Sequence, residues 1–387
     1  MTTPRFSILI PTRNRRGTLM FALETALAQT HDAFEVVVMD NHCSDGTTEY
    51  LEGLTHPRLR HVRSDGPLSM SSNWELGLSH CRGEYVTVIG DDDGLMPDAV
   101  AFGEAAVRQS GAEVVTWTPH TYWWPDTIVE AQRNMLYVQL AGGNDGSIES
   151  SGATLEHYYA FRVFFDALPM IYNSWVSRRV IDRVIAKVGR YFCTEAPDLF
   201  SGIANCAVTP SFLRIGRPLG IRGTSGKSNG TAYFVRSKGG ALREQVLSEA
   251  GLTLDDIVHA DLTATPIIEL FVASINALSR DLLFPGHPRY VVDLEAAIRM
   301  AVAGLARDPD SYDENIADIR ALCVKRGIDV SKFPMPPKQS APPAASRGPT
   351  FTQRQITGVA VDGTMAGLAT IADAVRLTSA MTFPSGL

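Results

Sequence analysis

The chain has few cysteines, and no two of them are spaced as CxxC. The five are scattered at Cys43, Cys81, Cys193, Cys206 and Cys323. An odd number without such a pair indicates reduced thiols in a cytosolic protein and no zinc site. No apolar run approaches the roughly 18 residues that cross a bilayer, and an apolar strand begins so early that we expect no signal peptide. We therefore expect a cytoplasmic protein, with peripheral contact at the inner face of the membrane left open.

Basic charge is in short supply as well. The chain has 35 Lys and Arg against 42 Asp and Glu, which gives a net charge of −7. Nucleic-acid binders usually present a basic face, so we expect no nucleic-acid partner. The glycine-rich stretch 222–230 also lacks the GxxxxGK[ST] spacing, since only two residues separate Gly223 from Gly226. This spacing excludes a P-loop NTPase.

Apolar strands alternate with helices through the first hundred residues. We predict strands at 6–10, 34–39, 59–62 and 85–89, and helices at 18–30, 47–54 and 71–81. This alternation predicts βαβ units and a mostly parallel sheet, and therefore an α/β fold. A chain of 387 residues is long enough for one large domain with appendages.

Polar clusters stand at three of the predicted strand ends: Pro11-Thr12-Arg13, Asp40-Asn41 and Asp91-Asp92-Asp93. Ligands of open α/β sheets collect outside the carboxyl ends of the strands, so the coincidence favours one binding site over three ordinary polar loops. Adjacent carboxylates repel one another and are costly to bury unpaired. A bound Mg²⁺ or Mn²⁺ would compensate them, with substrate phosphates as further ligands. A solvated acidic turn is the alternative.

Three stretches together resemble a known family. They are SILIPTRNR at 7–15, VVVMDNHCSDGT at 36–47 and GEYVTVIGDDDGLMP at 83–97. In order and spacing they resemble the family 2 glycosyltransferases of the GT-A fold, closely over about the first 110 residues and more loosely to about residue 235. The resemblance implies a Rossmann-like, mostly parallel sheet flanked by helices, and a nucleotide diphosphate sugar as donor.

The resemblance assigns the first two strand ends to the nucleotide base. Pro11, Thr12 and Arg13 would line the base pocket. Asp40 would accept a hydrogen bond from the base, as an aspartate does from the uracil imide, so a UDP-sugar is the favoured donor.

The third strand end would hold the reacting part of the donor. Asp91 and Asp92 would lie beside the ribose, diphosphate and sugar, and Asp93 would be the principal Mn²⁺ or Mg²⁺ ligand of the DXD-type motif. Many members carry an aspartate where this chain has Gly90. Asp91 offers an alternative DXD frame, so the carboxylates that face the metal stay open.

A second departure concerns the donor diphosphate. Many members have an Ala-Arg-Asn triplet where this chain has Ser71-Ser72-Asn73, so Asn73 remains a donor-binding candidate while the expected arginine is missing. Another group must then hold the diphosphate or sugar. We predict that the 222–230 loop closes over the diphosphate and contributes Lys227 and Ser228, with a plain exposed loop as the alternative.

An inverting glycosyl transfer needs one carboxylate that takes the proton of the acceptor hydroxyl. The resemblance places an acidic residue in this part of the chain; Asp198 is our choice and Glu195 its competitor. Pro197 begins a helix, so favourable charge at a helix N-terminus is the structural alternative for Asp198. The indoles of Trp123 and Trp124 are candidates for the acceptor platform, because aromatic faces stack on sugars, and core packing is their alternative.

The predicted domains are 1–235 for the catalytic domain, 240–333 for a helical appendage, 334–350 for a Pro- and Ala-rich linker, and 351–387 for a tail helix. The appendage would cover the acceptor side or mediate self-association. The tail lacks the basic face of a membrane-surface helix, so docking on protein is favoured over contact with a membrane.

Together with the resemblance these features predict a metal-dependent glycosyltransferase, and the resemblance alone implies that it is inverting. It would move a sugar from a nucleotide diphosphate sugar to a hydroxyl of a glycan, lipid-linked or small-molecule acceptor, in glycan or polysaccharide biosynthesis. A non-catalytic sugar-nucleotide or carbohydrate-binding module is one alternative. A sugar nucleotidyltransferase is another, although Pro11-Thr12-Arg13 lacks the glycines of its phosphate loop.

Overall fold

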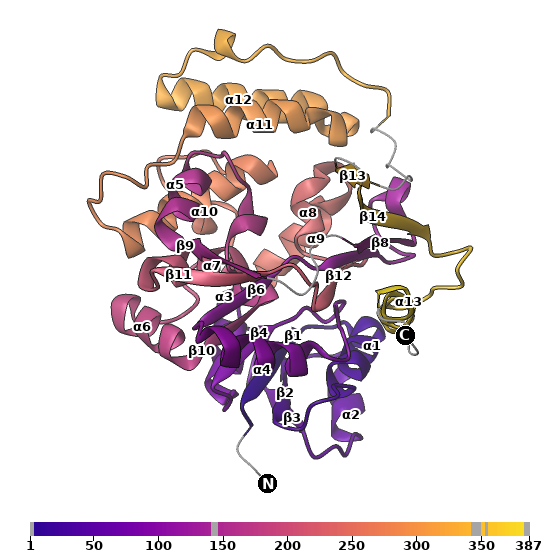
Figure 1. Ribbon diagram of the computed structural model, residues 1–387. Coiled ribbons are helices and arrows are strands. Elements are labelled where there is room, and N and C mark those ends of the chain that lie inside the picture. Colours follow the sequence, from indigo (N-terminus) through magenta and orange to yellow (C-terminus); the bar gives the residue numbers. More distant parts are fainter. Residues whose placement is uncertain (1–3, 141–145, 342–349, 353–354, 383–387) are drawn as a thin grey trace.

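A large mixed sheet forms the N-terminal part of the molecule (Figure 1). The computed structural model describes residues 4–140, 146–341, 350–352 and 355–382. The strand order is β3-β2-β1-β4-β10-β6-β11-β9, in which β3, β2, β1 and β4 are parallel and β10 is antiparallel to both neighbours. The predicted α/β fold with a mostly parallel sheet is confirmed. The strands are β1 (Phe6–Thr12), β2 (Phe34–Asp40), β3 (Leu59–Arg63), β4 (Tyr85–Val88), β6 (Val114–Trp117), β9 (Gly146–Ser150), β10 (Ser174–Ser177) and β11 (Ser211–Ile215).

Helices flank this sheet. Every residue of β1 and β2 is buried, as expected for parallel strands that are covered on both faces and therefore consist of continuous apolar runs. The flanking helices are α1 (Arg16–Leu27), α2 (Thr47–Glu52), α3 (Met70–His80), α4 (Ala99–Ser110), α5 (Ser151–Tyr159), α6 (Arg178–Val188) and α7 (Pro197–Val208).

Strand register brings the predicted polar clusters to one edge. Thr12 pairs with Asp40 across β1 and β2, and Leu9 pairs with Val88 at the end of β4. The 91–93 segment therefore follows β4 at the edge where β1 and β2 also end.

A second sheet stands beside the first and has the order β13-β14-β8-β7-β12-β5. Most of its pairs are antiparallel, and the sequence analysis did not predict it. The two-residue strand β5 directly follows Asp93, so this sheet fixes the far side of the acidic segment. Its strands are β5 (Gly94–Leu95), β7 (His120–Trp123), β8 (Met135–Gln139), β12 (Gly220–Thr224), β13 (Thr350–Thr352) and β14 (Gln355–Asp362).

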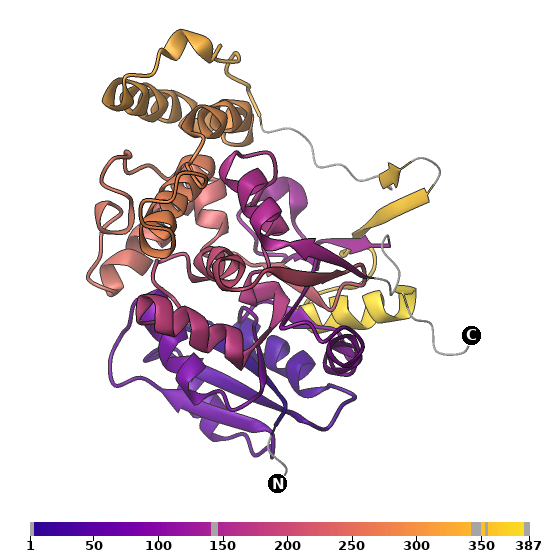
Figure 2. The same ribbon diagram turned by 60° about the vertical axis from the view of Figure 1, so that its left-hand side comes forward.

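The C-terminal segment differs from the tail helix predicted at 351–387. Its first part is a strand, β14, which pairs with β8, and only Ile371–Thr382 (α13) is helical. The β-branched residues before Asp362 gain backbone hydrogen bonds from the exposed edge of β8, so tertiary pairing overrides the helical pattern. Helix α13 packs on α1, β5 and β12 (Figures 1 and 2). The tail therefore docks on its own chain.

The part of the chain between β12 and β13 is mostly helical. Figures 1 and 2 show α11 and α12 at the end of the molecule farthest from β1–β4. The helices are α8 (Thr231–Phe234), α9 (Arg236–Glu249), α10 (Ile268–Leu283), α11 (Leu294–Gly304) and α12 (Tyr312–Arg326). Short 3-10 turns occupy Glu130–Gln132, Phe165–Ala167, Ile171–Asn173, Asp255–Ile257, Leu305–Arg307, Pro309–Ser311 and Val330–Lys332.

Candidate active site at the carboxyl edge of the sheet

Asp91 is held by the end of β1 and the turn that follows it. Thr12 Oγ1 donates to Asp91 Oδ2 at 2.7 Å, and Arg15 Nη1 donates to Oδ1 at 3.1 Å. The side chain is only 3% exposed. Burial raises the pKa of Asp91, and the charge of Arg15 acts in the opposite direction. Each oxygen of Asp91 thus already accepts a hydrogen bond from the protein.

Asp92 is covered by the 223–229 loop. Its Oδ2 accepts hydrogen bonds from Ser225 N at 3.1 Å, from Ser225 Oγ at 2.6 Å and from Ser228 Oγ. In the part of the chain that the structure describes, no residue donates to Oδ1. Asp92 therefore offers one carboxylate oxygen that a ligand could use.

Asp93 is satisfied by backbone amides and by a tyrosine. Gly223 N donates to Oδ1 and Gly90 N to Oδ2, each at 2.7 Å, and Tyr172 hydrogen-bonds the same carboxylate. Burial, with the charge of Asp92 as the next cause, raises the pKa of Asp93. A Cβ at Gly90 would lie 2.6 Å from Tyr172 Oη. The glycine that departs from the family pattern therefore makes room for this tyrosine.

Tyr172 connects the acidic segment to the predicted catalytic base. Its ring stacks on Trp74, with centroids 6.0 Å apart and planes 12° apart. Burial raises the pKa of Tyr172 well above its ordinary value, with further contributions from the charges of Asp93, Asp92 and Asp198. Its phenol stays protonated and can donate to Asp93, while Asp198 lies close enough to act on it electrostatically.

Asp198 and Glu195 have different surroundings. Asp198 is the second residue of α7, is partly exposed, and has a pKa raised by burial. Glu195 instead closes the N-terminus of α3: Ser69 Oγ donates to Oε1 at 2.8 Å, Ser71 Oγ donates to the same oxygen, and Ser71 N donates to Oε2 at 3.2 Å. This arrangement supports Asp198 over Glu195 as the group that remains able to accept a proton.

Asp40 is fully buried, and both of its carboxylate oxygens have partners within the protein. Cys43 N donates to its Oδ1 at 2.8 Å, and Thr48 Oγ1 and His61 Nε2 lie 2.6 and 3.2 Å from its Oδ2. Burial works to raise the pKa of Asp40, but hydrogen bonds led by those from His61 and Thr48 outweigh it and hold the pKa well below its ordinary value. The carboxylate is therefore ionised and fixed in position.

The remaining donor candidates lie nearby with differing partners. Pro11 is buried at the end of β1, and Arg13 Nε pairs with Glu249 of α9 at 2.6 Å. Asn73 is buried in α3, and its Oδ1 has no hydrogen-bond partner among the described residues. Lys227 is exposed, and its Nζ donates to Asn14 O at 3.2 Å. The structure thus turns Arg13 toward the helical region and brings Lys227 to the turn after β1.

The predicted aromatic acceptor platform is wrong for Trp124. This side chain is 6% exposed and packs in the core cluster between the second sheet and α13. Its Nε1 donates to Asp92 O at 2.9 Å, so it supports the acidic segment from behind. A buried ring leaves no free face for a sugar. Trp123, at the end of β7, is only partly exposed.

Four contributors were missed in the sequence: Arg15, Tyr172, Gly223 and Ser225. Only Asn14 separates Arg15 from the recognised Pro11-Thr12-Arg13 cluster, so its position near that cluster was an available signal. Its Nη2 donates to Asn229 Oδ1 at 3.0 Å and also to Lys227 O, which ties the loop to the β1 end. Tyr172 carries no motif. It reaches the site only because β10 inserts between β4 and β6.

The donor set fits a divalent cation that shares its coordination with substrate. Among the described residues, no group of three or more His, Cys, Asp and Glu side chains is arranged to hold a metal ion. Mg²⁺ and similar cations commonly use one or two carboxylates, with phosphates and water completing the shell. The Oδ1 atom of Asp92, beside Asp93, supplies a donor of this kind.

The fold and site define a class of protein that binds a ligand at the carboxyl edge of an α/β sheet, against an acidic segment. Residues 7–141 match the family model for Glycosyl transferase family 2. This part of the chain is therefore a family 2 glycosyltransferase domain, and the resemblance read from the sequence is confirmed. In the described ranges, the helices are all too short or too polar to cross a membrane.

A succinoglycan biosynthesis protein of Rhizobium meliloti (strain 1021), ExoO, is 27% identical over 111 residues, which are 29% of this chain and 32% of that protein. The matched region spans between 16% and 39% of the length of three such curated relatives. Whole-chain activities are therefore not transferred from them.

Two solved structures are similar in shape. TarS of S. aureus (residues 1–349, with UDP-GlcNAc) is 14% identical, with 84% of this chain and 92% of that chain covered and a TM-score of 0.47. The mannosyltransferase PcManGT of Pyrobaculum calidifontis, with GDP-Man and Mn²⁺, is 16% identical, with 84% and 83% covered and a TM-score of 0.41. At these values neither ligands nor residue roles carry over.

Proposed function

We propose that this chain is a nucleotide-sugar-dependent glycosyltransferase of glycan or polysaccharide biosynthesis, metal-dependent and inverting. The observation that carries the proposal is that Thr12 and the 91–93 carboxylates meet at one sheet edge within the matched residues 7–141, with Asp198 close enough to act electrostatically on Tyr172 beside them. Relatives named for polysaccharide synthesis support the biological setting.

In the proposed reaction, the acceptor hydroxyl attacks the anomeric carbon of the donor sugar while its proton passes to Asp198. A base is most effective when its pKa approaches the working pH, and burial moves the pKa of Asp198 in that direction. Asp92, through its Oδ1 atom beside Asp93, would hold a divalent cation that offsets the charge of the leaving diphosphate. Arg15 and the 223–229 loop would position the diphosphate.

The proposal is tested by melting the protein with UDP-, GDP-, dTDP- and CMP-sugars, with and without Mn²⁺. A ligand that binds only the folded state raises the melting temperature, so one nucleotide class should stabilise the protein in a Mn²⁺-dependent way. Asp92→Asn should abolish the Mn²⁺ dependence. Stabilisation by none of them, or an unchanged response in Asp92→Asn, would contradict the proposal.

Inversion is tested separately by the product. Proton NMR of the glycoside formed from an α-linked donor should show the β anomer in the first turnovers. Retention of the α configuration would overturn the role given to Asp198, because direct attack by an acceptor that this base activates is a single displacement and inverts the anomeric carbon.

A further inference from the structure

A hollow that is open to solvent adjoins the candidate active site. Its floor and walls are mostly apolar, and its polar members are Glu195, Asn229, Tyr233 and Arg243. The apolar lining comes from Met70, Val246, Leu247, Ala250, Leu252 and Ile257.

This hollow is joined to the acidic segment by hydrogen bonds. Asn229 Oδ1 accepts from Arg15, and Arg15 in turn pairs with Asp91. Glu195, which also lines the hollow, stands three residues before Asp198 in the sequence. The hollow thus borders both the loop that covers the donor site and the segment that bears the proposed base, which is where an acceptor must approach.

Arg243 is the feature that points to a ligand. Its guanidinium is partly buried, lies 5.6 Å from the centroid of the Tyr233 ring, and donates through Nη1 to Ala232 O at 3.1 Å. No described carboxylate lies within ion-pair distance of it, and its other two nitrogens donate to no described residue. A guanidinium stays charged at any physiological pH and matches carboxylate or phosphate with two parallel hydrogen bonds.

The acid in the same hollow does not neutralise Arg243. Both oxygens of Glu195 are engaged by Ser69 and Ser71 at the N-terminus of α3, where a helix favours negative charge. Glu195 therefore makes no ion pair with Arg243 among the described residues, and the free guanidinium nitrogens of Arg243 remain for a ligand.

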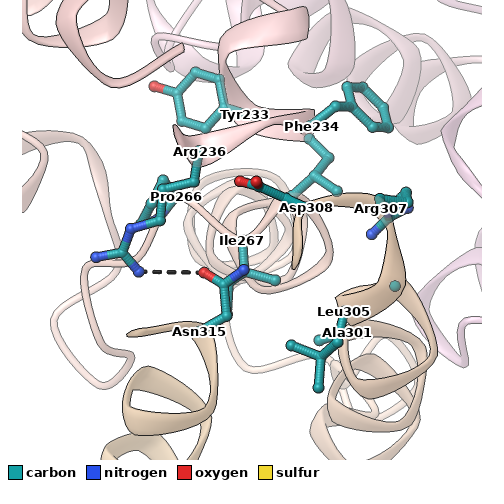
Figure 3. Close-up of a pocket in the computed structure, with 12 residues that line it drawn as sticks. Tyr233, Phe234, Arg236, Pro266, Ile267, Ala301, Leu305, Arg307, Asp308 and Asn315 are labelled. Atoms are coloured by element: carbon teal, nitrogen blue, oxygen red, sulfur yellow. Dashed lines mark hydrogen bonds between the residues drawn. The ribbon is translucent and has the colours of Figure 1, made fainter. Parts of the chain in front are cut away.

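A second hollow offers a contrast (Figure 3). It shares Tyr233 with the first, but its charged groups are paired within the protein. Arg236 binds Asp318 at 2.7 Å and Asn315 at 3.2 Å, and Asp308 accepts from Ser237 N at 2.8 Å. Nothing in that hollow calls for a charged ligand.

We propose that the hollow at Arg243 is an acceptor subsite for a sugar that carries an anionic group, a carboxylate or a phosphate, with Arg243 as its counter-ion. This inference rests on the proposed function and adds to it the chemical class of the acceptor. The apolar wall suits the C–H faces of a sugar ring, and the few polar groups fix its orientation.

The test uses three probes that share one ring and differ at C6: glucose, glucuronic acid and glucose 6-phosphate. Ligand-observed NMR titrations on the full chain, with UDP and Mn²⁺ present, should show that an acid or a phosphate binds at least about tenfold more tightly than glucose. The two anionic arms distinguish carboxylate from phosphate. Arg243→Gln should remove the difference, and Arg243→Lys should restore part of it. Arg289→Gln is the matched control, because Arg289 is exposed and pairs with Glu156 away from the hollow.

Equal binding of all three sugars, or no binding by any of them, would overturn the acceptor assignment. So would a loss of UDP affinity in Arg243→Gln, since Arg243 would then serve the donor diphosphate. Melting of each variant with UDP and Mn²⁺ keeps the two proposals apart. An intact donor response with no anion preference refutes the subsite alone, and no donor response in the unmutated chain refutes the proposed function.

Discussion

Single residues set how closely backbone and carboxylates approach at the acidic segment. The backbone of Gly223 lies so close to this segment that a Cβ atom on Gly223 would be 1.8 Å from Asp92 O. Its amide is also a donor to Asp93. Only glycine fits this position. Its φ angle is not positive, so the restriction comes from the close approach of the Asp92 backbone and not from the conformation of Gly223 itself.

We expect Gly223→Ala to displace β12 from the acidic segment. The overlap should cost at least about 1–3 kcal/mol of unfolding free energy and should weaken the Mn²⁺-dependent donor response in melting experiments. Gly230→Ala is the control, since a Cβ there meets nothing within 4 Å. Equal stability of the two variants would show that the loop yields easily.

His120 gives an expected pH dependence of stability. It is 1% exposed, its Nδ1 accepts from Gln139 N at 3.0 Å, and burial lowers its pKa to about 4. An unfolded histidine takes up a proton below about pH 6.5, whereas the folded one stays neutral until about pH 4. The unfolded state binds more protons in this window, so stability falls as the pH is lowered from 6.5, by at most about 1.4 kcal/mol per unit.

Urea unfolding at pH 7, 6 and 5 measures this dependence. His120→Asn keeps an acceptor near the position of Nδ1 and should show a flatter decline between pH 6.5 and 5. Parallel declines in the two proteins would assign the acid sensitivity to other groups.

Sequence motifs located some of the site residues but could not locate their partners. Thr12 and Asp91 were found because both stand at strand ends within recognisable motifs. Tyr172 and Gly223 were missed because each acts through contacts with an acidic segment that is distant from it in the sequence. Such contacts depend on the order of the strands in the sheets, which cannot be read from a local sequence motif.

At the scale of elements, Glu195 and Asp198 lie at the N-termini of two different helices. Glu195 satisfies the start of α3 from outside that helix, and Asp198 lies in the first turn of α7. The same side-chain type therefore has a stabilising role at one helix and the proposed catalytic role at the other.

We expect the two residues to separate stability from activity. Glu195→Gln should lower the unfolding free energy by about 1–2 kcal/mol, because it removes the negative charge at the α3 N-terminus and weakens the hydrogen bonds to Ser69 and Ser71. Asp198→Asn should leave stability and donor-induced melting shifts nearly unchanged while kcat falls by about 10²–10⁴. Melting curves and transfer rates measured on both variants test these roles. A loss of stability in Asp198→Asn together with a loss of kcat in Glu195→Gln would exchange them.

Element boundaries were predictable where the packing was local. The prediction placed the first strand at 6–10, and β1 spans Phe6–Thr12. The second sheet was not foreseen because β5 has only two residues and β14 joins from the far end of the sequence. A two-residue strand has no periodicity to detect.

At the scale of the whole molecule, the C-terminal segment is part of the support for the site. A Cβ on Gly94 would lie 2.7 Å from Val375 Cγ2 and 2.8 Å from Ile371 Cγ1, so α13 lies directly against the turn after the acidic segment. Arg376 also pairs with Glu24 of α1 at 2.9 Å.

Removal of this segment should affect the site as well as stability. A chain that ends at residue 341 loses Ile371 and Val375 from the core, each worth about 1.5–3 kcal/mol of buried apolar surface. We expect a lower melting temperature and no donor-induced shift. A chain that ends at residue 382 is the control, and normal donor binding by the shorter chain would show that the acidic turn holds its shape alone.

The position of α13 has a consequence for the order of events during translation. The ribosome makes Thr12 and Asp91 long before α13, and chains fold from their N-terminal parts as they emerge. The helix that backs Gly94 comes some 280 residues later, between Ile371 and Thr382. A nascent chain therefore completes the support of its acidic segment only after residues 371–382 have left the exit tunnel.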